Sequence, residues 1–397
     1  MPKKLMMNQN TSRSMVREIM TEFANQTGLS PATKSPRRYL WTDAFAVCNF
    51  LELYRQTNDE KYKNLALRLV DQVHNILGRH REDDPRTGWI SGLDEERGKI
   101  HPTKGGLRIG KEMKERRPTD PFDEQLEWDR DGQYYHYLTK WMHALNRVSR
   151  VTGDIIYNTL AIELAKTAHA RFIYDPSPDG QKRMYWKMSI DLYYPLVESM
   201  GHHDPLDGFI TYNQLQATAA KDSESSTCLD LNAEITDMAN ICEGKSWATD
   251  DPLGLGGLLC DACRVAQLII NENFEQADLL EILLDSSLPG LESYSRNNPL
   301  KLPAQYRLAF RELGLSIGLR AVNKLQGLIE ENPDLFNKKH PLHSRIETVM
   351  RYAPLIEVIE NFWLEATNRE ASSWTEHQDI NMVMLAASLT PDGYLTV

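Results

Sequence analysis

Two stretches of the chain repeat the same pattern, and this repeat restricts the fold more than any other feature. Residues 55–74 read RQTNDEKYKNLALRLVDQVH, and residues 150–169 read RVTGDIIYNTLAIELAKTAH. The copies share seven further residues at matching places after the initial Arg (Thr57/Thr152, Asp59/Asp154, Tyr62/Tyr157, Leu65/Leu160, Ala66/Ala161, Leu69/Leu164 and His74/His169). Each copy predicts a helix, a short turn, and a second helix with Asp at its cap. The repeated unit is a helical hairpin.

Apolar residues at helical spacing extend this pattern along the chain. We predict helices over 12–28, 39–56, 59–79, 131–150, 154–173, 208–220, 228–243, 254–271, 274–286, 303–327, 344–366 and 376–389. Alternating runs of Val, Ile, Thr and Tyr, which would indicate strands, are scarce. The sequence therefore predicts an all-α fold.

The connections between these helices alternate between short turns and long loops. Two segments stand out, near 80–130 and 174–207, and loops of such length in a compact domain are usually functional. This alternation predicts a ring of hairpins, with the long loops on one face beside the N-termini of the inner helices. We expect residues 1–397 to form a single domain with those two segments as long loop insertions.

Two segments carry a resemblance to a known superfamily: YLWTDAFAVCNFLELYRQTNDEKY and YLTKWMHALNRVSRVTGDIIY. With the alternating connections, they resemble the six-hairpin (α/α)6 toroids of the N-acylglucosamine 2-epimerase and glycosidase superfamily. The resemblance covers most of the chain from about residue 36. It implies an all-α (α/α)6 toroid whose chemistry takes place at the mouth of the ring.

Charge and hydropathy exclude several classes of partner. The chain has 45 basic and 56 acidic residues and a net charge of -11, so its overall field repels a phosphate backbone. The N-terminus lacks the apolar block of a signal peptide, and no run reaches the roughly 18 apolar residues of a membrane span. We expect a cytoplasmic protein that binds neither nucleic acid nor membrane, and the oligomeric state stays open.

The five cysteines do not indicate a disulfide framework or a zinc site. They are odd in number and mostly fall within apolar helical patterns, as reduced buried thiols do. Cys260 and Cys263 form a CxxC motif without a second pair or a flanking His. His202, His203 and Asp204 are adjacent, so their side chains diverge too much to chelate one ion well. We predict no metal and no cofactor.

The segments that precede the predicted inner helices combine carboxylates with aromatic rings, as a sugar site requires. The candidate catalytic residues are Asp43, Asp129, Asp131, Asp250, Glu376 and His377. The candidate substrate-binding residues are Arg38, Trp41, Trp128, Arg130, His136, Trp186, His203, Tyr212, Trp247 and Trp374. For any single residue, helix capping or loop packing is an equally good explanation.

Local patterns refine the expectation for Asp43. A helix that begins with Ser35 as its cap and Pro36 at its first position would carry Asp43 about two turns inside. A carboxylate there requires a partner, and Arg37 or Arg38 is suitably spaced.

Three other patterns concern the remaining helix starts. Asp251 before Pro252 fits a cap better than a catalyst. Thr375 with Gln378 fits a capping box, which would place Glu376 and His377 in the first helical turn. The GLGG run at 254–257 follows no strand, so close helix packing explains it better than phosphate binding.

Three functions are consistent with these patterns. The first is a glycoside hydrolase in which one carboxyl donates a proton and a second activates water or attacks the sugar. The second, implied by the resemblance, is an epimerase or isomerase that uses two histidines. There His377 suits one role, but DPLGLGGLLCDAC lacks the expected second histidine, so His136 or His203 would have to take its place. The third is a toroid that binds carbohydrate or peptide without catalysis.

Overall fold

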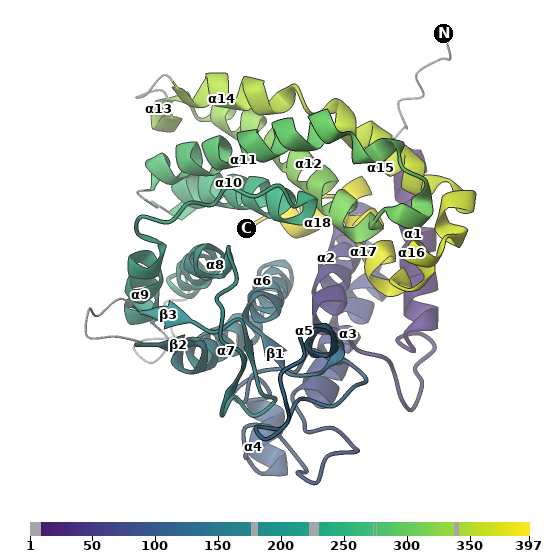
Figure 1. Cartoon of the computed structure of the whole chain (residues 1–397), viewed down its shortest axis with the longest axis vertical. Helices are drawn as coiled ribbons and strands as arrows, with labels where there is room; N and C mark the ends of the chain where they lie inside the picture. The colour runs from purple at the N-terminus through teal and green to yellow at the C-terminus, as the bar shows by residue number, and fades with distance from the viewer. Residues whose placement is uncertain (1–8, 176–181, 222–229, 273, 275, 337–340) are drawn as a thin grey trace. The chain divides into compact units, whose positions relative to one another are not determined.

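A computed structural model describes residues 9–175, 182–221, 230–272, 274, 276–336 and 341–397. Its residues group into two compact units (Figure 1). Unit 1 comprises residues 1–26, 49–62 and 246–397, and unit 2 comprises residues 27–48 and 63–245. The organisation of residues 1–397 as one domain stays a prediction.

Unit 2 contains helices from the N-terminal half of the chain and all the described strands. Its elements are the first part of α2 (Leu40–Thr57), most of α3 (Glu60–Leu77), α4 (Glu95–Ile100), α5 (Glu124–Asp129), β1 (Gln133–Tyr134), α6 (Tyr135–Thr152), α7 (Ile156–Phe172), β2 (Ile173–Tyr174), β3 (Arg183–Met184), β4 (Lys187–Met188), β5 (Pro195–Val197), α8 (Asp204–Ala219) and α9 (Asn232–Cys242). The helices α6, α7 and α8 pack against one another and bury a continuous apolar core.

The two copies of the repeat fold into the same turn, as their sequences predict. In the first copy, the Thr57 hydroxyl donates to the carbonyl four residues earlier at 2.7 Å and accepts from the Asp59 N–H at 3.2 Å. The Asp59 carboxylate then accepts from the Lys61 N–H at 3.1 Å, which satisfies a free donor at the start of α3. Thr152 and Asp154 make the same three bonds at 2.8, 3.2 and 3.0 Å.

The middle residue of each turn has left-handed backbone: φ is 57° at Asn58 and 76° at Gly153. We expect Gly153→Ala to lower the free energy of unfolding by about 1 kcal/mol, because Ala is strained in this region, while an added Cβ would meet no atom within 4 Å. Gly153→Asn, which copies the first turn, should cost less. Urea unfolding of both variants measures the difference, and an equal cost for Ala and Asn would contradict the backbone explanation.

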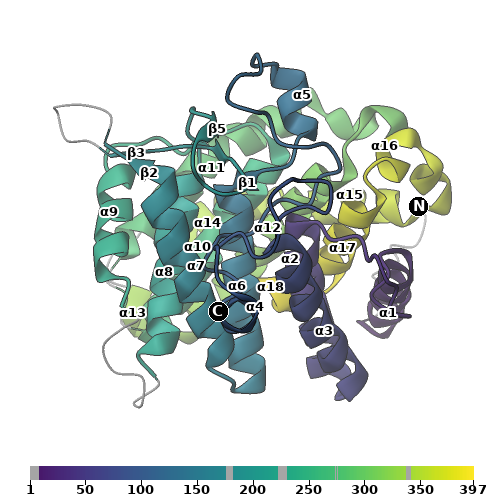
Figure 2. The same ribbon diagram turned by 90° about the horizontal axis from the view of Figure 1, so that it is seen from below.

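The long segments predicted as irregular loops contain short strands that the sequence analysis missed. Strands β1, β4 and β5 form an antiparallel sheet, with Gln133 opposite Met188 and Lys187 opposite Val197. A second antiparallel pair joins β2 to β3. These strands have only two or three residues each, too short for an alternation pattern to reveal them. Figure 2 shows α5 and the first sheet beside the start of α6.

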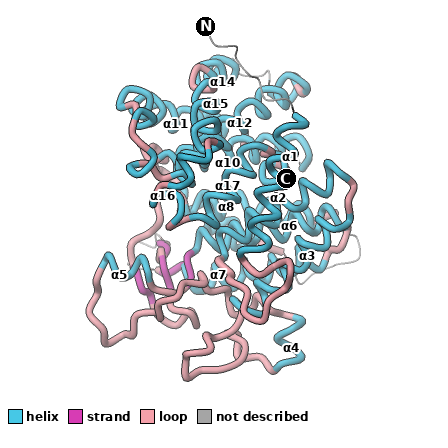
Figure 3. Tube along the Cα trace, turned by 90° about the vertical axis from the view of Figure 1, so that its right-hand side faces the viewer, coloured by secondary structure: helices cyan, strands magenta, loops and turns pink. Residues whose placement is uncertain are grey.

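Ion pairs hold the loop between α3 and α6, most of which has no regular structure (Figure 3). The Arg86 guanidinium binds the carboxylates of Asp84, Glu115 and Asp191. Lys187 is buried, and its ammonium donates to the carboxylate and the backbone carbonyl of Glu127. These bonds join the two long segments near 80–130 and 174–207 to each other within unit 2.

Unit 1 is all-helical within its described residues. It comprises α1 (Gln9–Gln26), the remaining parts of α2 and α3, α10 (Pro252–Glu272), α11 (Ala277–Asn297), α12 (Ala309–Glu331), α13 (Pro333–Phe336), α14 (Pro341–Met350), α15 (Pro354–Leu364), α16 (Ser372–Thr375), α17 (Gln378–Leu389), α18 (Asp392–Leu395) and the 3-10 turns η1 (Pro299–Lys301), η2 (Ala304–Tyr306) and η3 (Ala366–Glu370).

Two helix boundaries in unit 1 differ from the prediction, and a proline explains the first of them. The helix expected over 344–366 is divided into α14 and α15, and Pro354 begins the second of them. The helix expected over 274–286 continues to Asn297 with Pro289 inside it, and it ends at Asn298 in left-handed backbone.

Glycines let α10 and α12 approach each other closely. A Cβ added at Gly256 would lie 2.0 Å from the carbonyl oxygen of Gly314, and one at Gly318 would lie 2.5 Å from the Cα of Gly256. The GLGG run therefore serves helix packing, as predicted. The expectation that no segment reaches membrane-span length was wrong for α10, which is long and apolar enough to cross a membrane. However, 72% of its most apolar 18-residue window is buried inside the structure.

Candidate active site

Four consecutive aromatic residues, 134–137, span the end of β1 and the start of α6, and their side chains point in different directions. Tyr135 is fully buried, and its hydroxyl donates to that of Tyr212 at 2.8 Å. Tyr134, His136 and Tyr137 contact one another instead, with ring centroids 4.9–5.2 Å apart. The crowded start of this helix thus combines one core anchor, Tyr135, with three rings of an aromatic cluster.

We define the aromatic cluster as Trp41, Tyr134, His136, Tyr137 and Trp186, all of unit 2. The Trp186 ring stacks on His136 at 6.3 Å with an interplanar angle of 19°. The Trp41 ring meets His136 edge-on at 6.0 Å from the first turn of α2. Trp186 lies between β3 and β4, so the missed strands are what bring this residue to α6. The exposed Trp128 ring, 5.0 Å from Trp186, extends the cluster outward.

His136 faces a buried carboxyl at the start of α8. Its Nδ1 atom lies 3.7 Å from Oδ1 of Asp204. Among the described residues, neither that nitrogen nor Oδ2 of Asp204 has a hydrogen-bond partner, although both atoms are buried. The His136 side chain is 25% exposed and that of Asp204 only 7%, so the imidazole is the member of the pair that a ligand can reach.

The environment shifts the pKa values of these two groups in opposite directions. Burial lowers the pKa of His136 to about 3, and the nearby Lys140 charge lowers it further. Burial raises the pKa of Asp204 to about 8, and the Asp207 carboxylate adds to this effect. At neutral pH the carboxyl therefore keeps its proton beside a neutral imidazole. Such a pair is suited to acid–base chemistry.

A charged pair and a hydroxyl pair support the aromatic cluster. The Asp207 carboxylate accepts from the Lys140 ammonium at 2.7 Å and from the Thr139 hydroxyl at 2.6 Å. The two hydroxyls of Tyr39 and Tyr137 lie 2.7 Å apart, and burial raises the pKa of Tyr39 to about 12. These bonds fix the rings and limit the motion of His136.

The pKa of Asp204 predicts how stability varies with pH. Its folded value is raised above the ordinary 3.8, so this group's stabilising contribution is full below about pH 4 and is lost as the pH rises through about 8. We expect the wild type to lose stability relative to Asp204→Asn as the pH rises from 6.5 to about 8, by at most about 1.4 kcal/mol per pH unit, and the difference to level off above pH 8. His136, whose pKa is lowered, loses its contribution only as the pH falls from 6.5 towards 3.

Thermal unfolding of both proteins across this range measures the difference. An Asp154→Asn variant, changed at an exposed turn, is the matched control and should follow the wild type. Parallel curves for the wild type and Asp204→Asn would contradict a protonated Asp204 in the folded protein.

Several predicted site residues of unit 2 hold the structure instead of facing the cluster. The helix expected from Ser35 begins at Leu40, so Asp43 lies in the first turn and not two turns inside. Its carboxylate accepts from the Tyr39 N–H at 2.9 Å and pairs with Arg38 at 3.3 Å, as the spacing predicted. Tyr212 lies in the core.

Asp131 is the most completely bonded of the predicted carboxylates. It is fully buried and accepts from Arg108 at 3.0 Å, Arg81 at 3.3 Å and the Gly110 N–H at 2.9 Å. Both arginines belong to the long loop, so this carboxylate anchors that loop before β1. The adjacent Asp129 is exposed at the end of α5.

Two further predicted binding residues of unit 2 lie at element ends. The Arg130 carbonyl accepts from the buried Lys187 ammonium at 2.8 Å, so its backbone serves the loop structure. The His203 ring lies 4.6 Å from that of His202 immediately before α8. Among the described residues, no group of three His, Cys, Asp or Glu side chains is arranged to hold a metal ion.

The predicted residues of unit 1 divide between the core and the surface. Trp247 and Trp374 are buried, and the Trp374 ring stacks on Trp363 at 5.6 Å. Glu376 and His377 are exposed. The predicted capping box is wrong: Thr375 ends α16, its hydroxyl contacts the Ser372 carbonyl, and α17 begins only at Gln378. Glu376 and His377 therefore precede that helix.

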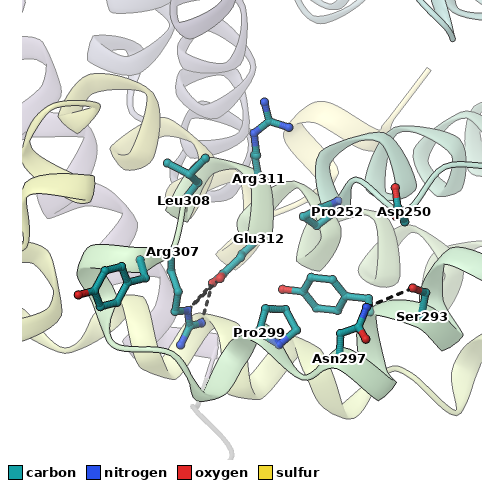
Figure 4. Close-up of a pocket in the computed structure, with 11 residues that line it drawn as sticks. Asp250, Pro252, Ser293, Asn297, Pro299, Arg307, Leu308, Arg311 and Glu312 are labelled. Atoms are coloured by element: carbon teal, nitrogen blue, oxygen red, sulfur yellow. Dashed lines mark hydrogen bonds and ion pairs between the residues drawn. The ribbon is translucent and has the colours of Figure 1, made fainter.

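Of the predicted residues in unit 1, Asp250 lines the pocket that Figure 4 shows. Its neighbour Asp251 caps α10 by accepting from the Gly254 N–H at 3.0 Å, as predicted. The Asp251 carboxylate also pairs with Arg311 at 2.5 Å.

Six residues that complete the surroundings of His136 were not predicted from the sequence. These are Tyr39, Tyr134, Tyr137, Lys140, Asp204 and Asp207. The signal was the segment GHHDPLDG, which places two carboxylates one helical turn apart around a proline that starts a helix. We considered Asp204 only as a metal ligand, and its distance to His136 could not be read from spacing.

The fold and this cluster define an all-α protein with a histidine–carboxyl pair among aromatic rings. No protein-family model and no curated protein matches the chain in sequence. A solved sugar epimerase from a ruminal bacterium is similar in structure, with a TM-score of 0.52, 11% identity, and coverage of 96% of this chain and 98% of that one. The GH76A alpha-1,6-mannanase from Salegentibacter sp. HEL1_6 has a TM-score of 0.50, 12% identity, and coverage of 96% and 99%. These similarities confirm the predicted all-α (α/α)6 toroid class.

Proposed function

We propose that this protein is a carbohydrate-active enzyme, and that it hydrolyses a glycosidic bond with the pair of His136 and Asp204 as its proton donor. The observation that carries the proposal is a carboxyl that stays protonated at neutral pH, 3.7 Å from the accessible imidazole of an aromatic cluster. Two solved structures of similar fold, whose titles name a sugar epimerase and a mannanase, support a sugar as the substrate.

The aromatic cluster has the composition of a sugar-binding surface. The partly exposed Trp186 ring can pack against the C–H side of a sugar ring, and the buried Trp41 ring contacts His136. The exposed Trp128 ring beyond them could contact a second ring of an oligosaccharide. This composition therefore favours a small sugar or an oligosaccharide over a peptide as the substrate.

The proton-donating step uses both members of the pair. His136 gives the proton on Nε2 to the glycosidic oxygen while the Asp204 proton passes to Nδ1. A new O–H bond forms on the leaving sugar, the C–O bond to the anomeric carbon breaks, and Asp204 becomes a carboxylate beside a neutral imidazole. Water then forms the new C–O bond to the anomeric carbon, and the proton that it loses returns through His136 to Asp204. The 3.7 Å separation must shorten by about 1 Å for this transfer, which is common when a substrate closes a site.

A second function is favoured by the same imidazole. His136 is neutral at pH 7 and can accept a proton from the carbon next to a sugar carbonyl, but a pKa lowered to about 3 makes it a weak base. That is the epimerase chemistry for which the sequence analysis required His136 or His203. Hydrolysis remains the first proposal because the pair holds its extra proton at neutral pH.

Incubation in D2O with a panel of oligosaccharides and free sugars separates these functions. Proton NMR would show a new reducing end after hydrolysis, and deuterium at C2 of an uncleaved sugar after epimerisation. Binding without either change would support the non-catalytic alternative. Asp204→Asn and His136→Gln should abolish the signal, whereas Glu376→Gln should not. An unchanged panel with no binding would overturn the proposal that sugars are the substrates.

A further inference from the structure

Unit 1 contains a pocket of about 350 Å³ that shares no residue with the aromatic cluster. It is built at the starts of α10 and α12 and the end of α11, and Figure 4 shows Asp250 and Pro252 on one side and Arg307 and Glu312 on another. Its volume falls within the range for sites that hold small organic ligands.

One wall of the pocket is rigid. The Arg307 guanidinium donates to both Glu312 carboxylate oxygens, at 2.8 and 2.6 Å, and stacks on the Phe362 ring at 3.6 Å. The Trp363 indole N–H donates to the same carboxylate at 2.8 Å. This ion pair is therefore satisfied internally, and it holds the wall in one arrangement.

Two donors in the pocket have no partner among the described residues. The Tyr294 side chain is 7% exposed, and its buried hydroxyl makes no hydrogen bond. The Arg311 Nε atom is likewise buried and unpaired, although its guanidinium pairs with Asp251 through another nitrogen. Leaving a buried donor unpaired costs about 1–3 kcal/mol, so a ligand that supplies acceptors here would recover that cost.

The rest of the lining is suited to a polyhydroxylated ring. Asp250 is exposed and offers a carboxylate acceptor, and Asn297 offers an amide whose nitrogen donates to the Ser293 hydroxyl at 3.4 Å. Tyr306 is 69% exposed and supplies an aromatic face, with Pro252, Pro299 and Leu308 as further apolar surface.

The charges of the lining favour a neutral ligand. Arg307 pairs with Glu312 and Arg311 with Asp251, which leaves the carboxylate of Asp250 as the excess charge. An anionic ligand would meet this negative charge, whereas a hydroxyl can donate to it.

We propose that this pocket binds one neutral sugar ring, whose hydroxyl oxygens accept from Tyr294 and Arg311 and whose hydroxyl hydrogens donate to Asp250. The site is additional to the proposed catalytic pair and does not depend on it. Its occupant is a terminal residue of an oligosaccharide or a free monosaccharide.

Saturation-transfer NMR and calorimetry with methyl glucoside, methyl mannoside and glucuronate test the proposal. We expect at least one neutral glycoside to bind the wild type, and Tyr294→Phe to weaken that binding about tenfold. Tyr294→Phe removes an unpaired buried hydroxyl, so it should fold at least as stably as the wild type. Glu292→Gln, changed at an exposed position of α11, should bind like the wild type.

A Trp186→Ala variant, which removes a stacking ring of the aromatic cluster, distinguishes this pocket from the cluster. If the pocket is the site, the glycoside should bind Trp186→Ala as it binds the wild type. Binding that is lost in Trp186→Ala but kept in Tyr294→Phe would overturn the proposal and assign the sugar to the cluster. Glucuronate binding as tight as that of the neutral glycosides, or the absence of any binding, would also overturn it.

Discussion

A His136→Phe variant will convert its sugar substrate about 10²–10⁴-fold more slowly than the wild type, measured as kcat/KM. The His136 ring lies between those of Trp41 and Trp186, with centroid distances of 6.0 and 6.3 Å. Phenylalanine keeps a flat ring at this place, but it cannot give or take a proton. Binding through stacking should therefore survive, so the loss should appear in kcat more than in KM.

The controls for this variant separate chemistry from folding. Circular dichroism and thermal unfolding should match the wild type closely, because the buried Nδ1 atom of His136 makes no hydrogen bond among the described residues that the change would break. His377→Phe, at an exposed position of unit 1, should leave kcat/KM within about twofold, far below the general-acid effect. Full activity of His136→Phe would exclude the imidazole from the reaction.

A Gly256→Ala variant will lose about 3 kcal/mol of unfolding free energy, the upper end of the range for overpacked cores. The new methyl group would lie 2.0 Å from the Gly314 carbonyl oxygen, and backbone cannot move aside as a side chain can. The helices α10 and α12 would have to separate along their whole contact, and the apolar packing between them would weaken.

Gly257→Ala is the matched control, one residue further along α10. Its added Cβ meets no atom within 4 Å, so it should stabilise the protein by about 1 kcal/mol through helix propensity. Denaturant unfolding of both variants gives the two values with opposite signs. A loss for both, or for neither, would contradict close packing through Gly256.

The sequence predicted the architecture well because helical hairpins leave local signals. The turns at Thr57 and Thr152 make identical bonds, as their identical residue types require. The boundary near Pro354 was missed because apolar spacing continues through it. The strands were missed because their pairing joins segments far apart in the chain, such as Gln133 and Met188.

The candidate site was only partly predictable, for a similar reason. Trp41, His136 and Trp186 were predicted as binding residues, and the structure brings them together. Asp131 has the same local signature as a catalytic carboxylate, but distant arginines bind it. Asp204 lies 68 residues from His136 in the chain, and no spacing rule connects residues on different hairpins. Which carboxylates are free and which are bonded is decided by tertiary contacts.

The most direct test of the central claim compares two substrates in one variant. A general acid matters most when the leaving group is a poor one, as a sugar is, and least when it departs without a proton, as dinitrophenolate does. For Asp204→Asn we predict a loss of about 10²-fold or more in kcat/KM on the oligosaccharide, and a loss of less than about tenfold on the dinitrophenyl glycoside of the same sugar. Equal losses on both substrates would contradict the assignment of His136 and Asp204 as the proton donor.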